Sequence, residues 1–374
     1  MALPSPASLS TPQLLDELAL YLRPPGQGIH TVSSGKAEAE TFTKNYLGSF
    51  SASDTGFWRR HLDQLQNLKG QKAVALLAIP SDCGAGIMRG ASHGPEAIRK
   101  SLKQAPCLDL GDVFSVPHFI DDEMLSDAQK KRARASLYPD SKDRDCLPVS
   151  PVGMASRVYR LLRAVNPELK ILLLGGDHTV TWPAVEAILE GGAEKNRDVA
   201  IVHFDAHTDL LPERLGVKYC FATWAYHANE LLGRGGRLLQ IGIRISGKPK
   251  QHWEKECGVR QIWANEANAL SPDRLAESVV AHLNSIGVKR FYLSNDLDGT
   301  DAQWASATGT PEPGGLTPDH VLAVIHRLGS SGMKSLGADV VELAPGLSLS
   351  HEASRLSVET AVRYVRAELE LLGK

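Results

Sequence analysis

The sequence has few cysteines and no excess of charge of either sign. Its five cysteines are scattered, odd in number and free of any CxxC pair, which argues against a disulfide framework and against a zinc knuckle. Lys and Arg number 41, and Asp and Glu number 43. The sequence therefore predicts no broad basic face for nucleic acid or for a membrane surface, and a small molecule is the expected partner.

The sequence also lacks a long apolar run. A transmembrane helix needs roughly 18 or more consecutive apolar residues, and the N-terminus has neither the basic region nor the apolar region of a secretory signal. These absences predict a cytoplasmic protein without membrane insertion. The 43% hydrophobic content of the 374 residues is ample for a sizeable core.

From about Ala73 onward, apolar strand-like runs alternate with amphipathic helical segments. The expected strands are AVALLAIP, LDLGDV, KILLLGG, VAIVHFDAH, RLLQIGIR, RFYLSND and LGADVVELAP. This alternation is typical of a parallel sheet covered by helices on both faces. Helices are expected to begin after Ser271 and Thr317, where a capping hydroxyl precedes a proline, and Gly287 is expected to end the first of them.

Two regions do not show this alternation. Residues 1–72 are expected to form two or three short helices, one in TPQLLDELALYL and one around Trp58. Residues 121–150 are charged and interrupted by proline, which indicates a surface excursion. We therefore divide the chain into a helical extension, residues 1–72, and a main domain, residues 73–374. Packing or an oligomer contact is the simplest role for both regions, and the extension is also a candidate cap over a pocket.

Four of the expected strands end in carboxylate or imidazole groups. The ligand crevice of a parallel sheet lies beyond the carboxyl ends of its strands, and residues two apart in extended backbone point to the same side. These groups are therefore expected to converge. KILLLGG is followed by Asp177 and His178, VAIVHF by Asp205, His207 and Asp209, RFYLSN by Asp296, Asp298 and Asp301, and LGADVV by Glu342.

So many carboxylates at the mouth of an apolar sheet repel one another unless cations neutralise them. Four aspartates and two imidazoles form an oxygen-rich set that suits Mn²⁺ and is compatible with Co²⁺, Ni²⁺ or Fe²⁺, unlike a thiolate zinc site. Exposed loop acids would explain any one of these motifs alone, but poorly explain all of them together. We therefore predict two divalent metal ions at this edge of the sheet.

These motifs resemble those of the ureohydrolases, the family of arginase and agmatinase. GGDHTV resembles the motif GGDH[ST], FDAHTD resembles DAH.D, and SNDLDGTDAQWASATGTPEPGGL resembles S.D.D..DP...P..GTP.PGG. DVVELAP and MRGASHGPEAIRKSL resemble two further segments, and the match runs in order from about Val74 to the C-terminus. The resemblance implies a three-layer α/β/α sandwich around a mainly parallel sheet of about eight strands. It also implies a homo-oligomer, either a trimer or a hexamer.

Carried over position by position, the resemblance implies ligands for both metal ions. Two bridging metals lower the pKa of a shared water and present hydroxide to a guanidinium carbon, while Glu342 would hold the guanidinium. The implied reaction releases urea from a small cationic guanidino substrate, with Mn²⁺ as the expected metal and Ni²⁺ or Co²⁺ as alternatives. One ion would be held by His178, Asp205, Asp209 and Asp296, and the other by His207, Asp205, Asp296 and Asp298.

The sequence departs from the family at the proton shuttle. A His-Gly pair usually follows DAH.D, but Cys220-Phe221 stands at the corresponding place. Cys220 is one candidate for the relay if its pKa is lowered, and His227, seven residues on, is another. A small buried hydrophobe is the alternative interpretation of Cys220. His203 is assigned to packing or to the support of a metal ligand.

Further departures concern the substrate. Leu211 replaces an asparagine, and Ser246-Gly247 an aspartate, that meet the head group of arginine in arginases. Unpaired head-group charges disfavour arginine, so the expected substrate is agmatine, a guanidino acid or guanidine, with an agmatinase-like activity preferred to that of arginase. Trp304, in a loop that lacks two of the family's prolines, is expected either to line the entrance or to pack in the core.

Two other functions stay open. The missing shuttle histidine is compatible with a catalytically silent metal-binding paralogue or regulatory subunit. A hydrolase of another linear amidine C–N bond would carry similar motifs. All six implied ligands are present, however, and a cluster of four carboxylates without metal is costly. This cost favours the hydrolase.

Overall fold

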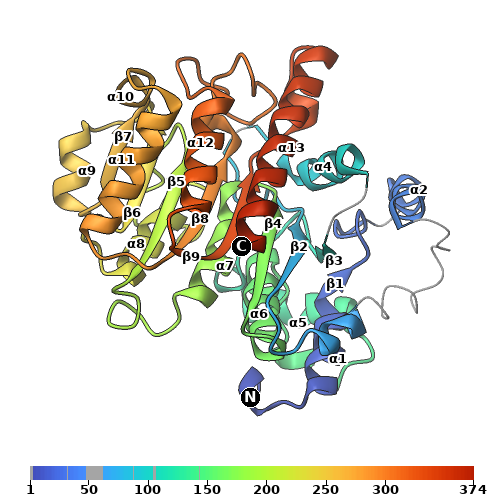
Figure 1. Cartoon of the computed structure of the whole chain (residues 1–374). Helices are drawn as coiled ribbons and strands as arrows, with labels where there is room; N and C mark the ends of the chain where they lie inside the picture. The colour runs from blue at the N-terminus through green and yellow to red at the C-terminus, as the bar shows by residue number, and fades with distance from the viewer. Residues whose placement is uncertain (1–2, 32, 48–61, 87, 104–106, 143) are drawn as a thin grey trace.

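The computed structural model describes residues 3–374 except 32, 48–61, 87, 104–106 and 143 (Figure 1). Its centre is a nine-stranded sheet of order β1-β3-β2-β4-β9-β8-β5-β6-β7. Every pairing is parallel except that of β1 with β3, so eight of the strands form the expected parallel sheet. The strands are β1 (Leu22–Arg23), β2 (Ala73–Ile79), β3 (Leu108–Val113), β4 (Leu169–Gly175), β5 (Val199–Phe204), β6 (Leu238–Ile243), β7 (Arg260–Trp263), β8 (Arg290–Asp296) and β9 (Lys334–Val341).

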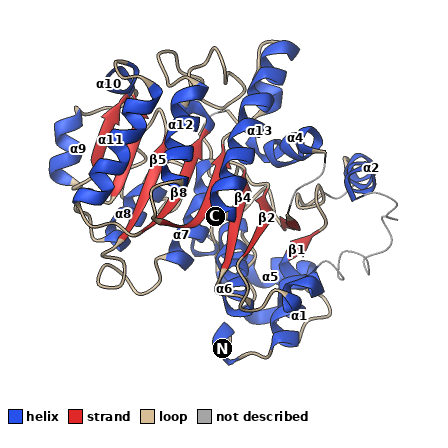
Figure 2. Ribbon diagram, viewed as in Figure 1, coloured by secondary structure: helices blue, strands red, loops and turns tan. Residues whose placement is uncertain are grey.

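Helices cover both faces of the sheet, as Figure 2 shows. The predicted three-layer α/β/α sandwich is confirmed. The helices are α1 (Thr11–Tyr21), α2 (Lys36–Leu47), α4 (Gly94–Leu102), α5 (Asp127–Leu137), α6 (Pro151–Val165), α7 (Thr181–Ile188), α8 (Trp224–Leu232), α9 (Lys250–Glu256), α10 (Ala264–Asn268), α11 (Pro272–Ser285), α12 (Pro318–Gly329) and α13 (His351–Gly373).

The apolar core has two parts, one on each face of the sheet. Helices α1, α6, α7 and α8 contribute to the first part, and α4, α10, α11, α12 and α13 to the second. Strand β2 serves both because successive side chains of a strand point to opposite faces. Ala75, Leu77 and Ile79 belong to the first part, and Leu76 and Ala78 to the second.

The expected helix boundaries are confirmed. The Ser271 side chain accepts a hydrogen bond from the backbone of Arg274 at the start of α11, and Thr317 accepts one from His320 at the start of α12. Gly287 follows α11 with a φ of +76°, a conformation that glycine adopts without the penalty of a Cβ. None of the helices in the described ranges combines the length and apolar character needed to cross a membrane.

The N-terminal extension is attached to the sheet. Its strand β1 pairs with β3, and α1 buries Leu14, Leu15 and Leu18 in the first part of the core. Oε2 of Glu17 on α1 lies 2.7 Å from a guanidinium nitrogen of Arg157 on α6. The predicted first helix is confirmed, and the segment around Trp58 lies outside the described residues. The division at residue 72 and the roles of oligomer contact and cap stay predictions.

Candidate metal centre

The candidate centre lies at the carboxyl ends of four adjacent strands, β4, β9, β8 and β5. His178 begins a short 3-10 turn after β4, Asp205 follows β5, and Asp296 ends β8. Glu342 follows β9. The sheet therefore brings together residues that are far apart in the sequence, as expected for the ligand crevice of a parallel sheet.

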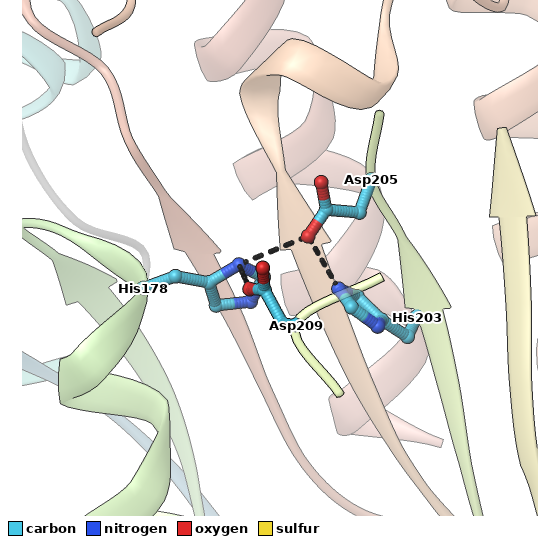
Figure 3. Close-up of side chains that lie close together, drawn as sticks. All are labelled: His178, His203, Asp205 and Asp209. Atoms are coloured by element: carbon cyan, nitrogen blue, oxygen red, sulfur yellow. Dashed lines mark hydrogen bonds and ion pairs between the residues drawn. The ribbon is translucent and has the colours of Figure 1, made fainter. Parts of the chain in front are cut away.

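Three carboxylate oxygens surround one imidazole nitrogen of His178. Its Nδ1 lies 3.3 Å from Oδ2 of Asp205, 3.3 Å from Oδ2 of Asp209 and 3.0 Å from Oδ2 of Asp296. Figure 3 shows His178, Asp205 and Asp209 turned toward one another. The same Nδ1 is buried and has no hydrogen bond among the described residues. A divalent cation between these atoms would satisfy the nitrogen and neutralise the carboxylates.

A second group surrounds His207. Its Nδ1 lies 3.1 Å from Oδ2 of Asp298 and 3.4 Å from Oδ1 of Asp205. Asp205 therefore presents one oxygen to each group, which is the position expected of a bridging ligand. The side chain of His207 is 26% exposed, whereas those of His178 and Asp205 are 1% exposed. Solvent therefore reaches the pair of groups from the side of His207.

Local backbone geometry explains why glycines precede His178. A Cβ at Gly176 would lie 1.8 Å from the carbonyl oxygen of Ser81, so the strand can end here only with glycine. Two residues of the site have left-handed backbone without being glycine, Asp209 with φ of +50° and Glu342 with φ of +64°. Such a conformation costs on the order of 1–3 kcal/mol and persists where surrounding contacts hold it.

Hydrogen bonds hold both strained residues. Oδ2 of Asp209 accepts a bond of 3.0 Å from Nε1 of Trp224. The backbone N–H of Glu342 donates to the carbonyl of Gly176, and Oε1 of Glu342 accepts from the backbone N–H of His178 at 2.8 Å. Glu342 is thereby fixed beside the first group.

Ser294 and Asp339 fix the orientation of the His178 ring. Ser294 donates a hydrogen bond of 2.9 Å to Asp339, so its oxygen is free to accept from Nε2–H of His178, also at 2.9 Å. Asp339 also accepts from Tyr292 and Thr181. With the proton on Nε2, the lone pair on Nδ1 faces the three carboxylates. This is the tautomer that a metal-ligating imidazole needs.

His203 supports Asp205 in the same way. Nε2 of Gln240 lies 3.1 Å from Nδ1 of His203, and Nε2 of His203 lies 2.8 Å from Oδ2 of Asp205. Because the Gln240 amide is a donor, Nδ1 accepts and the proton lies on Nε2, toward Asp205. Figure 3 shows His178 and His203 reaching the same oxygen of Asp205, and the centres of the two rings lie 5.0 Å apart. This position agrees with the prediction that His203 supports a metal ligand. His203 is also close enough to His178, Asp205 and Asp209 to bind a metal ion with them.

The electrostatics of the cluster favour a cation. Burial, together with repulsion from neighbouring carboxylates, raises the pKa of Asp209 and of Asp296 well above the ordinary aspartate range. Burial alone would raise the pKa of Asp205 as well, but the close imidazoles of His178, His203 and His207 hold it well below that range. Burial would lower the pKa of His207, yet hydrogen bonds to Asp205 and Asp298 raise it to about 12. The cluster therefore binds protons at positions where a metal ion could bind in their place.

The other predicted site residues lie around this cluster. Cys220 is buried, its backbone N–H donates to Oγ1 of Thr223 at 2.9 Å, and burial raises the pKa of its thiol. Nε2 of His227 lies 3.1 Å from the carbonyl of Lys218, and its ring packs edge-on against Tyr219. Among the described residues, these contacts join His227 to the loop before α8 and not to a predicted ligand. The catalytic roles of Cys220 and His227 stay predictions.

Several supporting residues were not identified from the sequence. Oγ1 of Thr310 donates to Oδ2 of Asp298 at 2.9 Å, and Thr310 is the threonine of the GTP segment that the resemblance had marked. Ser294 and Asp339 likewise lie within quoted motifs. Trp224 lies in no such motif. A tryptophan at the start of an amphipathic helix is usually part of the core, so its sequence position did not indicate a role in the site. Asp301, grouped with the strand-end acids, instead accepts bonds from the backbone of Gly314 and Gly315.

Comparison with known proteins agrees with this geometry. A profile described as the Arginase family matches residues 72–366. The guanidinobutyrase of Pseudomonas aeruginosa is 30% identical, with 76% of this chain and 82% of that protein covered. The mitochondrial agmatinase of Gallus gallus is 32% identical, with 76% and 77% covered.

Solved structures show the same fold. Proclavaminate amidino hydrolase from Streptomyces clavuligerus superposes with a TM-score of 0.58 at 27% identity, covering 80% of this chain and 91% of that one. Among the relatives found, the name agmatinase occurs more often than arginase. With the family profile spanning most of its length and the acid and histidine residues gathered at the ends of the parallel strands, the chain belongs to the arginase family of hydrolases.

Proposed function

We propose that the protein is a metal-dependent ureohydrolase with two divalent ions, and that it releases urea from a guanidino compound other than arginine. The position of Asp205 carries the proposal, because one of its oxygens lies near Nδ1 of His178 and the other near Nδ1 of His207. Two imidazoles joined through one carboxylate form a dinuclear arrangement, whereas a single metal would leave one group unused.

The donor set fits divalent first-row metals. The first ion would be held by His178, Asp205, Asp209 and Asp296, and the second by His207, Asp205, Asp296 and Asp298. Carboxylate oxygens with imidazole nitrogens suit Mn²⁺, and Ni²⁺ or Co²⁺ are alternatives. When bound, such ions supply a hydroxide nucleophile at neutral pH.

The protein's own residues would orient the substrate. A guanidinium cannot be deprotonated near neutral pH, so it is recognised as a planar cation by a carboxylate. Oε1 of Glu342 accepts from the backbone of His178, which fixes the carboxylate beside the first group and leaves its other oxygen for the substrate. Water then adds to the guanidinium carbon, the C–N bond to the substrate's amine breaks, and the products are urea and an amine. Cys220 or His227 would carry the proton to the leaving amine.

Local contacts also argue against arginine as the substrate. Leu211 is apolar and 40% exposed at the position that meets the arginine head group in arginases. The Ser246 hydroxyl donates to the carbonyl of Lys248 at 2.7 Å, so it serves the turn it lies in. The relatives named guanidinobutyrase, guanidino acid hydrolase and agmatinase support a guanidino substrate of another kind.

Assembly and location are part of the same proposal. We expect a homo-oligomer, a trimer or a hexamer, in the cytoplasm, with the extension of residues 1–72 in an oligomer contact or over the pocket. Size-exclusion chromatography with light scattering on the full chain tests the assembly, and a monomer would contradict it.

Urea release tests the function. Protein loaded separately with Mn²⁺, Ni²⁺ and Co²⁺ is assayed on agmatine, 4-guanidinobutyrate, 3-guanidinopropionate, guanidine and arginine. We expect turnover of a non-arginine substrate that is abolished in Asp296→Ala and retained in Asp198→Asn, the matched control. Asp198 directly precedes β5 at the far end of the sheet from the site and pairs with Arg290 on the surface.

Other outcomes would overturn the proposal. Two bound metals without turnover of any substrate would indicate the silent metal-binding protein. Formamide release without urea from a formimino compound would indicate a hydrolase of another linear amidine bond. Turnover of arginine alone would contradict the argument from Leu211 and Ser246.

A further inference from the structure

One pocket lies at the same edge of the sheet as the candidate metal centre, and its residue Gly84 is hydrogen-bonded to Asp177, the neighbour of His178. It has a volume of about 220 Å³ and lies between the loop after β2 and the loop between β5 and α8. Its lining includes Cys83, Gly84, Arg89, Arg214, Cys220 and Phe221. Both loops leave the carboxyl ends of their strands, the edge of the sheet at which the metal centre lies.

Hydrogen bonds tie the walls of this pocket to the metal centre. The backbone N–H of Gly84 donates to Oδ2 of Asp177 at 2.9 Å, and Asp177 directly precedes His178. Two backbone hydrogen bonds, from Leu211 to Ala222 and from Tyr226 to Asp209, join the other wall to the segment that carries Asp209. The pocket is therefore held in a fixed position beside the first group of candidate ligands.

The charged side chains that line the pocket are both positive. Arg89 and Arg214 line it, and none of the described lining residues carries a carboxylate. Within the described part of the chain, neither arginine forms an ion pair. The guanidinium carbon of Arg214 lies 5.2 Å from the centre of the Phe221 ring, and a guanidinium nitrogen of Arg89 lies 3.4 Å from the carbonyl of Cys83.

Arginine side chains without a carboxylate partner match an anionic ligand. The planar guanidinium presents two parallel N–H donors to a carboxylate, a stronger and more directional contact than a lysine makes. A cationic ligand would meet two like charges in the same pocket. Both arginines are exposed, so solvent screens the attraction and each contributes a moderate part of it.

We infer that Arg89 and Arg214 determine specificity by binding the carboxylate of a guanidino acid whose guanidinium end lies at the metal centre. This inference rests on the proposed ureohydrolase function and narrows its substrate. Guanidine is too small to reach the pocket, and agmatine places an ammonium where the arginines lie. The expected order of preference is therefore guanidino acid first, with agmatine disfavoured by its second positive charge.

A specificity ratio tests this inference. We would measure kcat/KM for 4-guanidinobutyrate divided by kcat/KM for agmatine, two substrates with a four-carbon chain that differ in the charge of the far end. We expect the ratio to exceed about 10 in the wild-type protein and to fall about tenfold in Arg214→Gln and in Arg89→Gln. Arg214→Glu should lower it further, because its charge attracts the ammonium of agmatine. Loss of folded or metal-loaded protein changes both terms equally and leaves the ratio unmoved.

Lys218→Gln is the matched control. Lys218 is a cation of the same loop that packs over the Tyr219 ring and does not line the pocket. Its removal should leave the ratio within about twofold. A wild-type preference for agmatine, or an equal fall of the ratio in Lys218→Gln, would overturn the inference while leaving the ureohydrolase function in place.

The inference is also testable if no substrate is turned over. In that case the proposed function fails, and calorimetry of 4-guanidinobutyrate and agmatine binding to the manganese-loaded protein gives the same comparison. Tighter binding of 4-guanidinobutyrate that is lost in Arg214→Gln would support the carboxylate site. Equal or tighter binding of agmatine would refute it.

Discussion

Nε2 of His178 and Oγ of Ser294 lie 2.9 Å apart, a contact that joins the turn after β4 to strand β8. Asp339 on β9, the strand between them, accepts a hydrogen bond from the Ser294 hydroxyl. The orientation of the candidate metal ligand His178 thus depends on two residues that are not predicted ligands themselves.

Ser294→Ala should weaken metal binding without unfolding the protein. The substitution removes the acceptor for Nε2–H, so the ring loses its fixed tautomer and orientation. We expect roughly a tenfold weaker affinity for Mn²⁺, the lower end of the effect of such supporting residues. Calorimetric titration measures it. Ser285→Ala, in the exposed last turn of α11, is the control, and equal affinities in the two variants would contradict the role of Ser294.

The metal content of aspartate variants should distinguish a ligand that bridges both metal ions from a ligand of one ion. Asp205 lies beside both histidines, whereas Asp298 lies beside His207 alone. We expect Asp298→Asn to retain about one metal ion per chain and Asp205→Asn to retain less. Mass spectrometry of the metal content after dialysis checks this difference. Loss of both ions in Asp298→Asn, or of only one in Asp205→Asn, would show that the two groups are not organised as described.

Metal binding should release protons and strengthen as the pH rises. Although burial lowers it, hydrogen bonds to Asp205 and Asp298 raise the pKa of His207 to about 12, and burial and carboxylate repulsion raise the pKa of Asp209 and Asp296. These groups hold protons at neutral pH and must lose them to act as ligands. Mn²⁺ titrations between pH 6.5 and 8.5, in buffers of different ionisation enthalpy, should show at least one proton released per chain. An affinity that does not change with pH would contradict this linkage.

Glu342→Gln should impair turnover and leave the metals in place. The amide keeps an oxygen that can accept from the backbone of His178 but loses the charge that would hold a guanidinium. We expect kcat/KM to fall by about 100-fold or more, as for loss of an electrostatic contact in a buried site. The metal content, measured on the same samples, should be unchanged. If the variant lost metal instead, Glu342 would serve the metal centre and not the substrate.

Cys220→Ala should distinguish the two candidate proton relays. The thiol pKa of Cys220 is raised by burial, so the thiolate is scarce at neutral pH, which favours the interpretation of Cys220 as a small buried hydrophobe. We expect Cys220→Ala to keep kcat within about threefold, and His227→Ala to lower it if that ring carries the proton. A large loss of kcat in Cys220→Ala that Cys220→His restores would reverse this assignment.

The sequence predicted the parts of the fold that depend on strong local patterns. The seven expected strands are present because each is an apolar run long enough to be recognised. Strand β1, Leu22–Arg23, has only two residues, and β7, Arg260–Trp263, mixes two polar residues with two apolar ones. Both lie at the edges of the sheet, where pairing is determined by the neighbouring strand and not by the composition of the segment.

The site was predictable to the extent that its residues follow strands. His178, Asp205 and Asp296 were placed together because parallel strands end at one edge. The sequence gives no means of seeing that Trp224 would donate to Asp209, because helix α8 begins 15 residues after that aspartate and its orientation follows from packing. The pocket of Arg89 and Arg214 was missed for the same reason, since it joins two loops that no motif relates.

Strand β9 lies in the middle of the sheet, although it is the last strand in the chain. During synthesis, β2 to β4 and β5 to β8 leave the ribosome first, and the two halves of the sheet have no shared neighbour until residues 334–341 appear. His178 and Glu342, 164 residues apart, can meet only after that. The first group of candidate ligands, which joins His178 of one half to Asp209 of the other, is therefore completed only after β9 has been made. His207 and Asp298 follow neighbouring strands of the same half, so the second group can form earlier. Until β9 has been made, the carboxylates of the unfinished site are exposed to water, which stabilises their charge.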